Sequence, residues 1–189
     1  ASGGGVINNG LVDVFEFSFD DNTSISGTGT WGSAYTTLLA GSEVILSSDI
    51  NFGHNATKTF RVLTGGNLNL NGFTLNLNGA LGTAIFEQRA TSTTQSSGLI
   101  RSRGTAYLDL YTGSNFLPSV RVNTGTTTVL ATSSPFVATM NNLLTIDTGA
   151  TFRIEAGGYT LIMNDSVVNN GSIASGNTAS DFRMFGTHF

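Results

Sequence analysis

Residues Thr59–Leu70 read TFRVLTGGNLNL, and residues Leu143–Ile154 read LLTIDTGATFRI. Apolar and polar residues alternate in both stretches, and a Thr-Gly pair interrupts both at the same point. Alternation with a period of two is the pattern of a β-strand that buries one face. A glycine at the interruption permits the positive φ that a sharp corner requires. Each stretch therefore predicts two short strands joined by a tight corner.

The same pattern precedes Gly41 and Gly125, so that the glycines form two pairs with one spacing of 24 residues (65 − 41 and 149 − 125). Gly113 lies 12 residues before Gly125 and suggests two similar half-turns in each coil. A fixed period of about 20 to 45 residues built from short strands is typical of a solenoid. We therefore predict an all-β fold, a parallel β-helix with about 24 residues per coil and roughly six to seven coils.

The alternative fold is an antiparallel sandwich, which also consists of short strands separated by turn residues. The register favours the solenoid, because Phe60 and Val62 recur in phase with Leu144 and Ile146, and equivalent residues of a solenoid stack above one another. No proline-rich or charged linker divides the chain, so residues 1–189 are expected to form a single domain.

The composition excludes several classes of function. Only 11% of the residues are charged, and eight Lys and Arg stand against twelve Asp and Glu, so we expect no nucleic acid partner. The chain contains no cysteine, hence no disulfide and no thiolate zinc site. No apolar run approaches the roughly 20 residues of a membrane span, so we expect no transmembrane segment. The first residues lack the features of a signal peptide, so either one has been removed or the chain begins inside a larger protein.

The repeat is interrupted between residues 80 and 104, where a Ser- and Thr-rich stretch is flanked by charges. We predict a loop excursion here that binds an acidic or hydroxyl-rich partner through Glu87, Arg89, Arg101 and Arg103. The alternative is an ordinary coil with a long corner.

Residues 1–31 form the second interruption. Phe15, Phe17 and Phe19 alternate with polar residues, which predicts one strand outside the repeat. This strand either caps the first coil or pairs with another subunit. The other end carries Phe182, Phe185 and Phe189 and no amphipathic helix. We expect the two ends to form an assembly interface, which makes the protein a homo-oligomer or a filament.

Chemistry-bearing motifs are sparse. Asp20, Asn22 and Ser24 have the spacing of the first calcium ligands of a calcium-binding loop, but the loop's glycine and glutamate are replaced by Ile25 and Trp31. An Asx-rich turn is the alternative. The two histidines belong to no metal or nucleophile motif. We therefore predict no cofactor, no metal beyond this calcium candidate and no catalysis.

Residues 66–79 and 149–173 resemble bacterial cell-surface β-helix proteins, namely autotransporter passengers and filamentous-haemagglutinin-type adhesins. The resemblance implies secretion to the cell surface and a role in adhesion or fibre building. We also expect a surface glycan as a partner. The predicted function is thus a non-catalytic extracellular structural or adhesive module that continues end to end. The alternative is a β-helix that binds or degrades polysaccharide, as phage tailspikes do.

Overall fold

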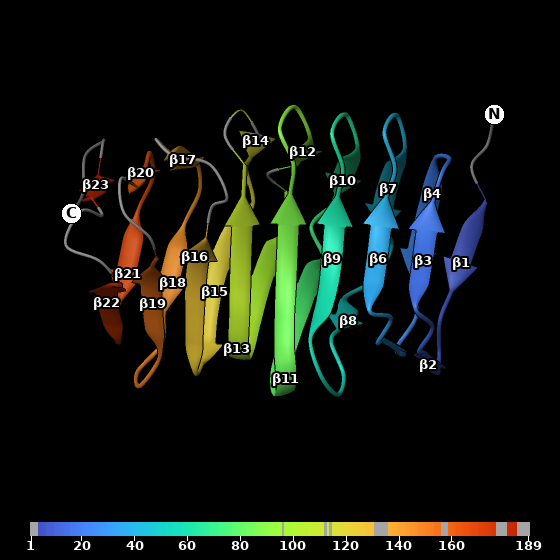
Figure 1. Cartoon of the computed structure of the whole chain (residues 1–189), viewed down its shortest axis with the longest axis horizontal. Coiled ribbons are helices and arrows are strands. Elements are labelled where there is room, and N and C mark those ends of the chain that lie inside the picture. Colours follow the sequence, from blue (N-terminus) through green and yellow to red (C-terminus); the bar gives the residue numbers. More distant parts are fainter. Residues whose placement is uncertain are drawn as a thin grey trace.

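The protein is a parallel β-solenoid in the computed structural model, which describes residues 4–184 apart from 96, 112, 114, 131–135, 156–158 and 177–180. All of its strand pairs are parallel, and the chain winds along one axis with its two termini at opposite ends (Figure 1). It makes about seven turns whose equivalent residues lie about 22 positions apart. The predicted architecture is therefore confirmed.

Each coil contributes strands to three faces. The first face is a sheet of nine strands, in the order β1 (Gly5–Ile7), β4 (Thr23–Ser26), β7 (Glu43–Leu46), β10 (Asn67–Asn69), β12 (Thr93–Thr94), β14 (Asn115–Phe116), β17 (Phe136–Met140), β20 (Tyr159–Met163) and β23 (Asp181–Met184).

The second and third faces share two long strands, β11 (Thr74–Gln88) and β13 (Leu99–Leu110), whose first halves lie on the second face and whose second halves lie on the third. The second face also contains β2 (Leu11–Val12), β5 (Thr30–Trp31), β8 (Ile50–Phe52), β15 (Ser119–Thr124), β18 (Leu144–Ile146) and β21 (Val167–Asn169). The third face also contains β3 (Glu16–Phe19), β6 (Tyr35–Leu38), β9 (Lys58–Val62), β16 (Thr126–Leu130), β19 (Thr151–Ile154) and β22 (Ser172–Ser175).

The glycine corners do not share one register, contrary to our prediction. Gly41 and Gly65 turn the chain from the third face to the first, whereas Gly125 and Gly149 turn it from the second face to the third. All four have φ between +74° and +80°, because each kind of corner needs the same left-handed residue between two strands. Phe60 and Leu144, which the sequence pattern aligned, therefore lie on different faces. Phe60 pairs with Phe86 on the third face, whereas Leu144 lies in β18 on the second face. The coil has three strands and not two half-turns.

The interior is a stack of apolar side chains that the alternation directs inward. Phe52, Phe60, Phe86 and Phe116 follow one another along the axis with ring centroids 5.5, 6.0 and 6.0 Å apart. All four are fully buried. The middle pair is stacked and the outer two meet edge to face. Aromatic pairs in both geometries contribute packing energy beyond their buried area, and they tie successive coils into one core.

The predicted loop excursion at residues 80–104 is wrong. β11 and β13 pair in parallel from Thr74 opposite Leu99 to Gln88 opposite Leu110, and the register shifts only between Gly79 and Thr83. The polar residues that suggested a loop are partly inside the core. Thr94 donates a hydrogen bond of 2.8 Å to the Oε1 atom of Gln88, and both side chains are buried. The stretch is an ordinary coil.

The N-terminal segment also belongs to the stack, although we predicted a strand outside the repeat. β2 and β3 form the first coil and pair in register with β5 and β6. Phe17 and Phe19 pack against Trp31, with ring centroids 5.1 and 6.0 Å away. Phe15 precedes β3 and is 76% exposed.

Candidate functional site

The four residues predicted to bind a partner lie on two different faces. Glu87 is in the second half of β11 and Arg89 directly follows it, so both lie along the third face. Arg101 and Arg103 are in the first half of β13, on the second face, and the corner at Gly104 ends that half. The structure therefore divides the predicted site into two.

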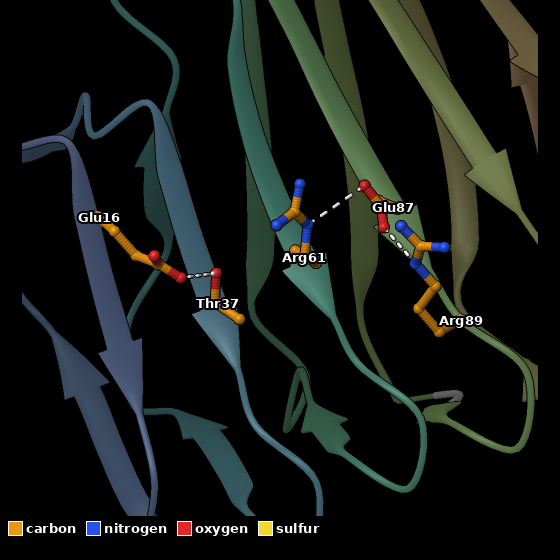
Figure 2. Close-up of polar contacts among 5 residues, drawn as sticks. All are labelled: Glu16, Thr37, Arg61, Glu87 and Arg89. Carbon is orange, nitrogen blue, oxygen red and sulfur yellow. Dashed lines mark hydrogen bonds and ion pairs between the residues drawn. The ribbon is translucent and has the colours of Figure 1, made fainter.

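Glu87 is the centre of a polar network on the third face (Figure 2). The Nε atom of Arg61, on β9, lies 3.3 Å from the Oε2 atom of Glu87, and the Nε atom of Arg89 contacts Oε1 from the other side. Each guanidinium also lies over a tyrosine ring, Arg61 4.3 Å from the centroid of Tyr35 and Arg89 4.2 Å from that of Tyr111. One continuous series of charge and cation–π contacts therefore spans neighbouring coils.

This network compensates the burial of a charge. Glu87 points away from the core by strand alternation, yet it is only 6% exposed because the two arginines cover it. A buried carboxylate is tolerated when paired and hydrogen-bonded, and removal of a partner is then costly. Both carboxylate oxygens are occupied, so Glu87 serves to hold Arg61 and Arg89 in place.

Asp109 faces Glu87 across the β11–β13 pair. Burial and the negative charge of Glu87 raise the pKa of Asp109 from 3.8 to about 6. The positive charge of Arg89 acts in the opposite sense but is the smallest of the three effects. Its Oδ1 atom is buried and accepts no hydrogen bond from the described part of the chain. The two carboxyls thus differ in their contacts: Glu87 pairs with two arginines, whereas Asp109 forms no ion pair with a described residue.

A smaller polar group lies beside the network. The hydroxyl of Thr37 donates a hydrogen bond of 3.0 Å to the Oε1 atom of Glu16 on the neighbouring strand (Figure 2). Ser18 donates to the same oxygen at 3.3 Å. These contacts extend the hydrogen bonding of the third face to the first coil.

The calcium candidate forms a hydrogen-bonded turn. The side-chain oxygen of Asn22 accepts the backbone N–H of Glu43 at 3.0 Å, and its backbone N–H donates to Asp21 at 2.7 Å. Ser24 lies in β4, where it pairs with Gly5. No group of three or more His, Cys, Asp or Glu side chains that could hold a metal ion occurs among the residues that the structure describes. The hydrogen bonds of Asn22 fit an Asx-rich turn, and calcium binding by Asp20, Asn22 and Ser24 stays a prediction.

The residues predicted to form the assembly interface lie at the two ends of the stack. Phe15 is exposed, whereas Phe17 and Phe19 are directed toward the core. Phe182, in β23 at the far end, is half-buried and packs against the core. Phe185 and Phe189 lie outside the described residues.

Besides Phe15, three exposed apolar residues at the N-terminal end were not predicted from the sequence. Ile7 is 71% exposed, and Leu11 and Val14 are about half exposed. Tyr35, Tyr111 and Asp109 were also not predicted as members of the Glu87 network. A signal was present for Asp109, because its spacing of 22 residues from Glu87 is close to one coil.

No protein-family model, curated protein or solved structure matches this chain. Within the described ranges, no helix is long and apolar enough to cross a membrane.

Proposed function

We propose that this protein is a non-catalytic, extracellular structural and adhesive module whose copies stack end to end. The supporting observation is the unpaired outer edge of the first coil. β1, β2 and β3 pair with β4, β5 and β6 on one side, and no other described strand pairs with them on the side facing away from the stack.

The backbone of the first coil is ready to accept further strands. The carbonyl of Gly4 accepts the N–H of Ser24, and Asn8 donates to the carbonyl of Ser26, so the backbone groups of alternate residues point to the second coil. In a parallel ladder, the residues that alternate with these direct their N–H and C=O groups to the other side of the strand, away from the second coil. On the third face the carbonyls of Phe15 and Phe19 likewise accept N–H groups of the second coil. Ile7 on the first face and Ser18 on the third therefore present backbone groups to a strand beyond the end.

A second copy of this chain is the occupant that fits. A partner must supply parallel strands on three faces at once, and the last described strands at the opposite end of the stack are β21, β22 and β23, one on each face. Figure 1 shows these strands at the far end of the axis from β1, β2 and β3. Unpaired edges with exposed apolar side chains are templates for strand addition.

The test is the state of association of three forms of the full chain by sedimentation and electron microscopy. We expect the wild type to form linear oligomers whose length rises with protein concentration. Replacing Ile7 and Ser18 by proline removes two outward N–H groups, which an edge strand tolerates, and should yield monomers with an unchanged circular dichroism spectrum. The matched control Ile7→Thr/Ser18→Thr keeps both N–H groups and should still assemble. A wild type that stays monomeric at high concentration would contradict the proposal.

A second candidate function, binding of a polysaccharide along the side of the solenoid, is favoured by the arginines of the second face.

A further inference from the structure

Three arginines form a ladder on the second face. Arg101 on β13 faces Arg121 on β15 in the register of the parallel pair, and Arg103 lies two residues beyond Arg101 on the same outward side. Neighbouring strands are about 4.8 Å apart, so the two facing side chains leave the sheet close together. Like charges that face each other across strands are unfavourable.

Two of these charges have no counter-ion among the described residues. The ion pairs formed by the described residues involve Lys58, Arg61, Arg89, Arg121 and Arg153, and none involves Arg101 or Arg103. Arg121 binds Asp147, with its Nε atom 3.1 and 3.2 Å from the two carboxylate oxygens. The Nε atom of Arg101 is buried and finds no hydrogen-bond acceptor in the part of the chain that the structure describes. A buried donor without an acceptor is costly, so a ligand that provides an anionic oxygen would gain by binding here.

Unpaired acceptors lie beside these donors. Asn76 faces Arg101 in the β11–β13 register and is 6% exposed; its Nδ2 atom donates to the carbonyl of Ile50 at 3.4 Å, whereas its Oδ1 atom accepts nothing from the described residues. The Oδ1 atom of Asn123, at the bulge opposite Arg103, is also buried without a donor. A ligand that satisfies both kinds of group must carry hydroxyl donors as well as anionic oxygens.

We propose that Arg101, Arg103, Arg121, Asn76 and Asn123 form a binding site for an acidic polysaccharide of the polyuronate class. The carboxylates of the sugar residues accept charge-assisted hydrogen bonds from the arginines, and the ring hydroxyls donate to the two asparagine oxygens. The ladder runs from coil to coil, so the polymer lies along the solenoid axis. A neutral glycan would leave the arginine charges uncompensated.

This inference specifies the ligand of the adhesive part of the proposed function and rests on it, but it does not require end-to-end stacking. The two can therefore fail separately. Arg101→Gln/Arg103→Gln should lose the polysaccharide and keep the wild-type state of association. The proline variant of the first coil should show the reverse.

The test is calorimetric titration of the full chain with oligogalacturonate and with a neutral glucan of equal length. We expect binding of the first alone, weakened by added salt because charge is screened. Arg101→Gln/Arg103→Gln should weaken it by about tenfold or more, as expected for the loss of hydrogen bonds to a charged group. Arg153→Gln, which removes an arginine from β19 on the third face, should change affinity less than about twofold.

A second variant separates recognition from charge. Asn76→Leu leaves the net charge unchanged and should also weaken oligogalacturonate binding, because it removes the acceptor for the sugar hydroxyl. Equal affinity of wild type and Arg101→Gln/Arg103→Gln would overturn the proposal. So would equal affinity for oligogalacturonate and for single-stranded DNA of the same charge, which would indicate a non-specific polyanion surface.

Discussion

The second and third faces of the central coils are made by the same two strands, β11 and β13, yet they treat charge in opposite ways. On the third face, Arg61 and Arg89 both bind Glu87, and their guanidinium groups rest on tyrosine rings. On the second face, Arg101 and Arg103 form no ion pair with any described residue. Charges that are paired inside the chain stabilise the coil stack, whereas charges left unpaired are available to a partner.

The largest expected effect is the loss of the buried carboxylate on the third face. Glu87→Gln should lower the free energy of unfolding by about 2–3 kcal/mol, because it leaves Arg61 and Arg89 without the buried carboxylate that both bind. The partly exposed Glu155, which pairs with Arg153, provides the control, since Glu155→Gln should cost less than about 1 kcal/mol. Chemical denaturation measures both. Equal losses of unfolding free energy in the two variants would show that the third-face network does not stabilise the coil stack.

The next effect concerns the proton affinity of Asp109. Because its pKa is raised from 3.8 to about 6 in the fold, the folded state binds the proton more tightly than the unfolded state. This carboxyl therefore lowers stability progressively as the pH rises through that window, and the loss is complete above it. Asp109→Asn should raise the Tm at pH 7 by about 2–4 °C, a modest change because partial exposure screens the charge.

The pH dependence provides the control for Asp109. The Tm advantage of Asp109→Asn over the wild type should vanish below pH 3.8, where the carboxyl is protonated in both states. An advantage that is constant with pH would attribute the effect to packing and not to ionisation.

The smallest effect is expected for the one arginine of the second-face ladder that has an internal partner. The side chain of Arg121 is 45% exposed and that of its partner Asp147 is 22% exposed. Arg121→Gln should therefore change the free energy of unfolding by only about 0.5 kcal/mol. A loss of unfolding free energy as large as that of Glu87→Gln would show that the ion pair on the second face stabilises the coil stack as well.

The sequence predicted the solenoid because alternation and corner glycines are local properties. It did not predict the number of faces, since the corner at Gly65 and the corner at Gly149 need the same residue types although they join different faces. Only the pairing between coils distinguishes them.

The error at residues 80–104 has a different cause. A hydroxyl- and amide-rich stretch normally indicates a loop, but Gln88 and Thr94 satisfy each other inside the core, and the hydroxyls of Ser102 and Thr127 do the same between neighbouring coils. Such pairing depends on which residues stack. The charged residues of the candidate site could be predicted from the sequence because charged residues are rare in this chain. Their division between the second and third faces could not, because it depends on the corner at Gly104.

The contrast between the faces is tested most directly by measuring unfolding free energy and oligogalacturonate affinity on two single variants, Arg61→Gln and Arg103→Gln. Each removes one positive charge from the same two-face region of the stack. Arg61→Gln should lower stability by about 1–2 kcal/mol and leave affinity unchanged. Arg103→Gln should leave stability within about 0.5 kcal/mol of the wild type and weaken binding. This contrast is contradicted if both variants lose stability and keep their affinity for oligogalacturonate. It is also contradicted if both variants lose affinity to the same extent, because the third face would then not differ from the second in function.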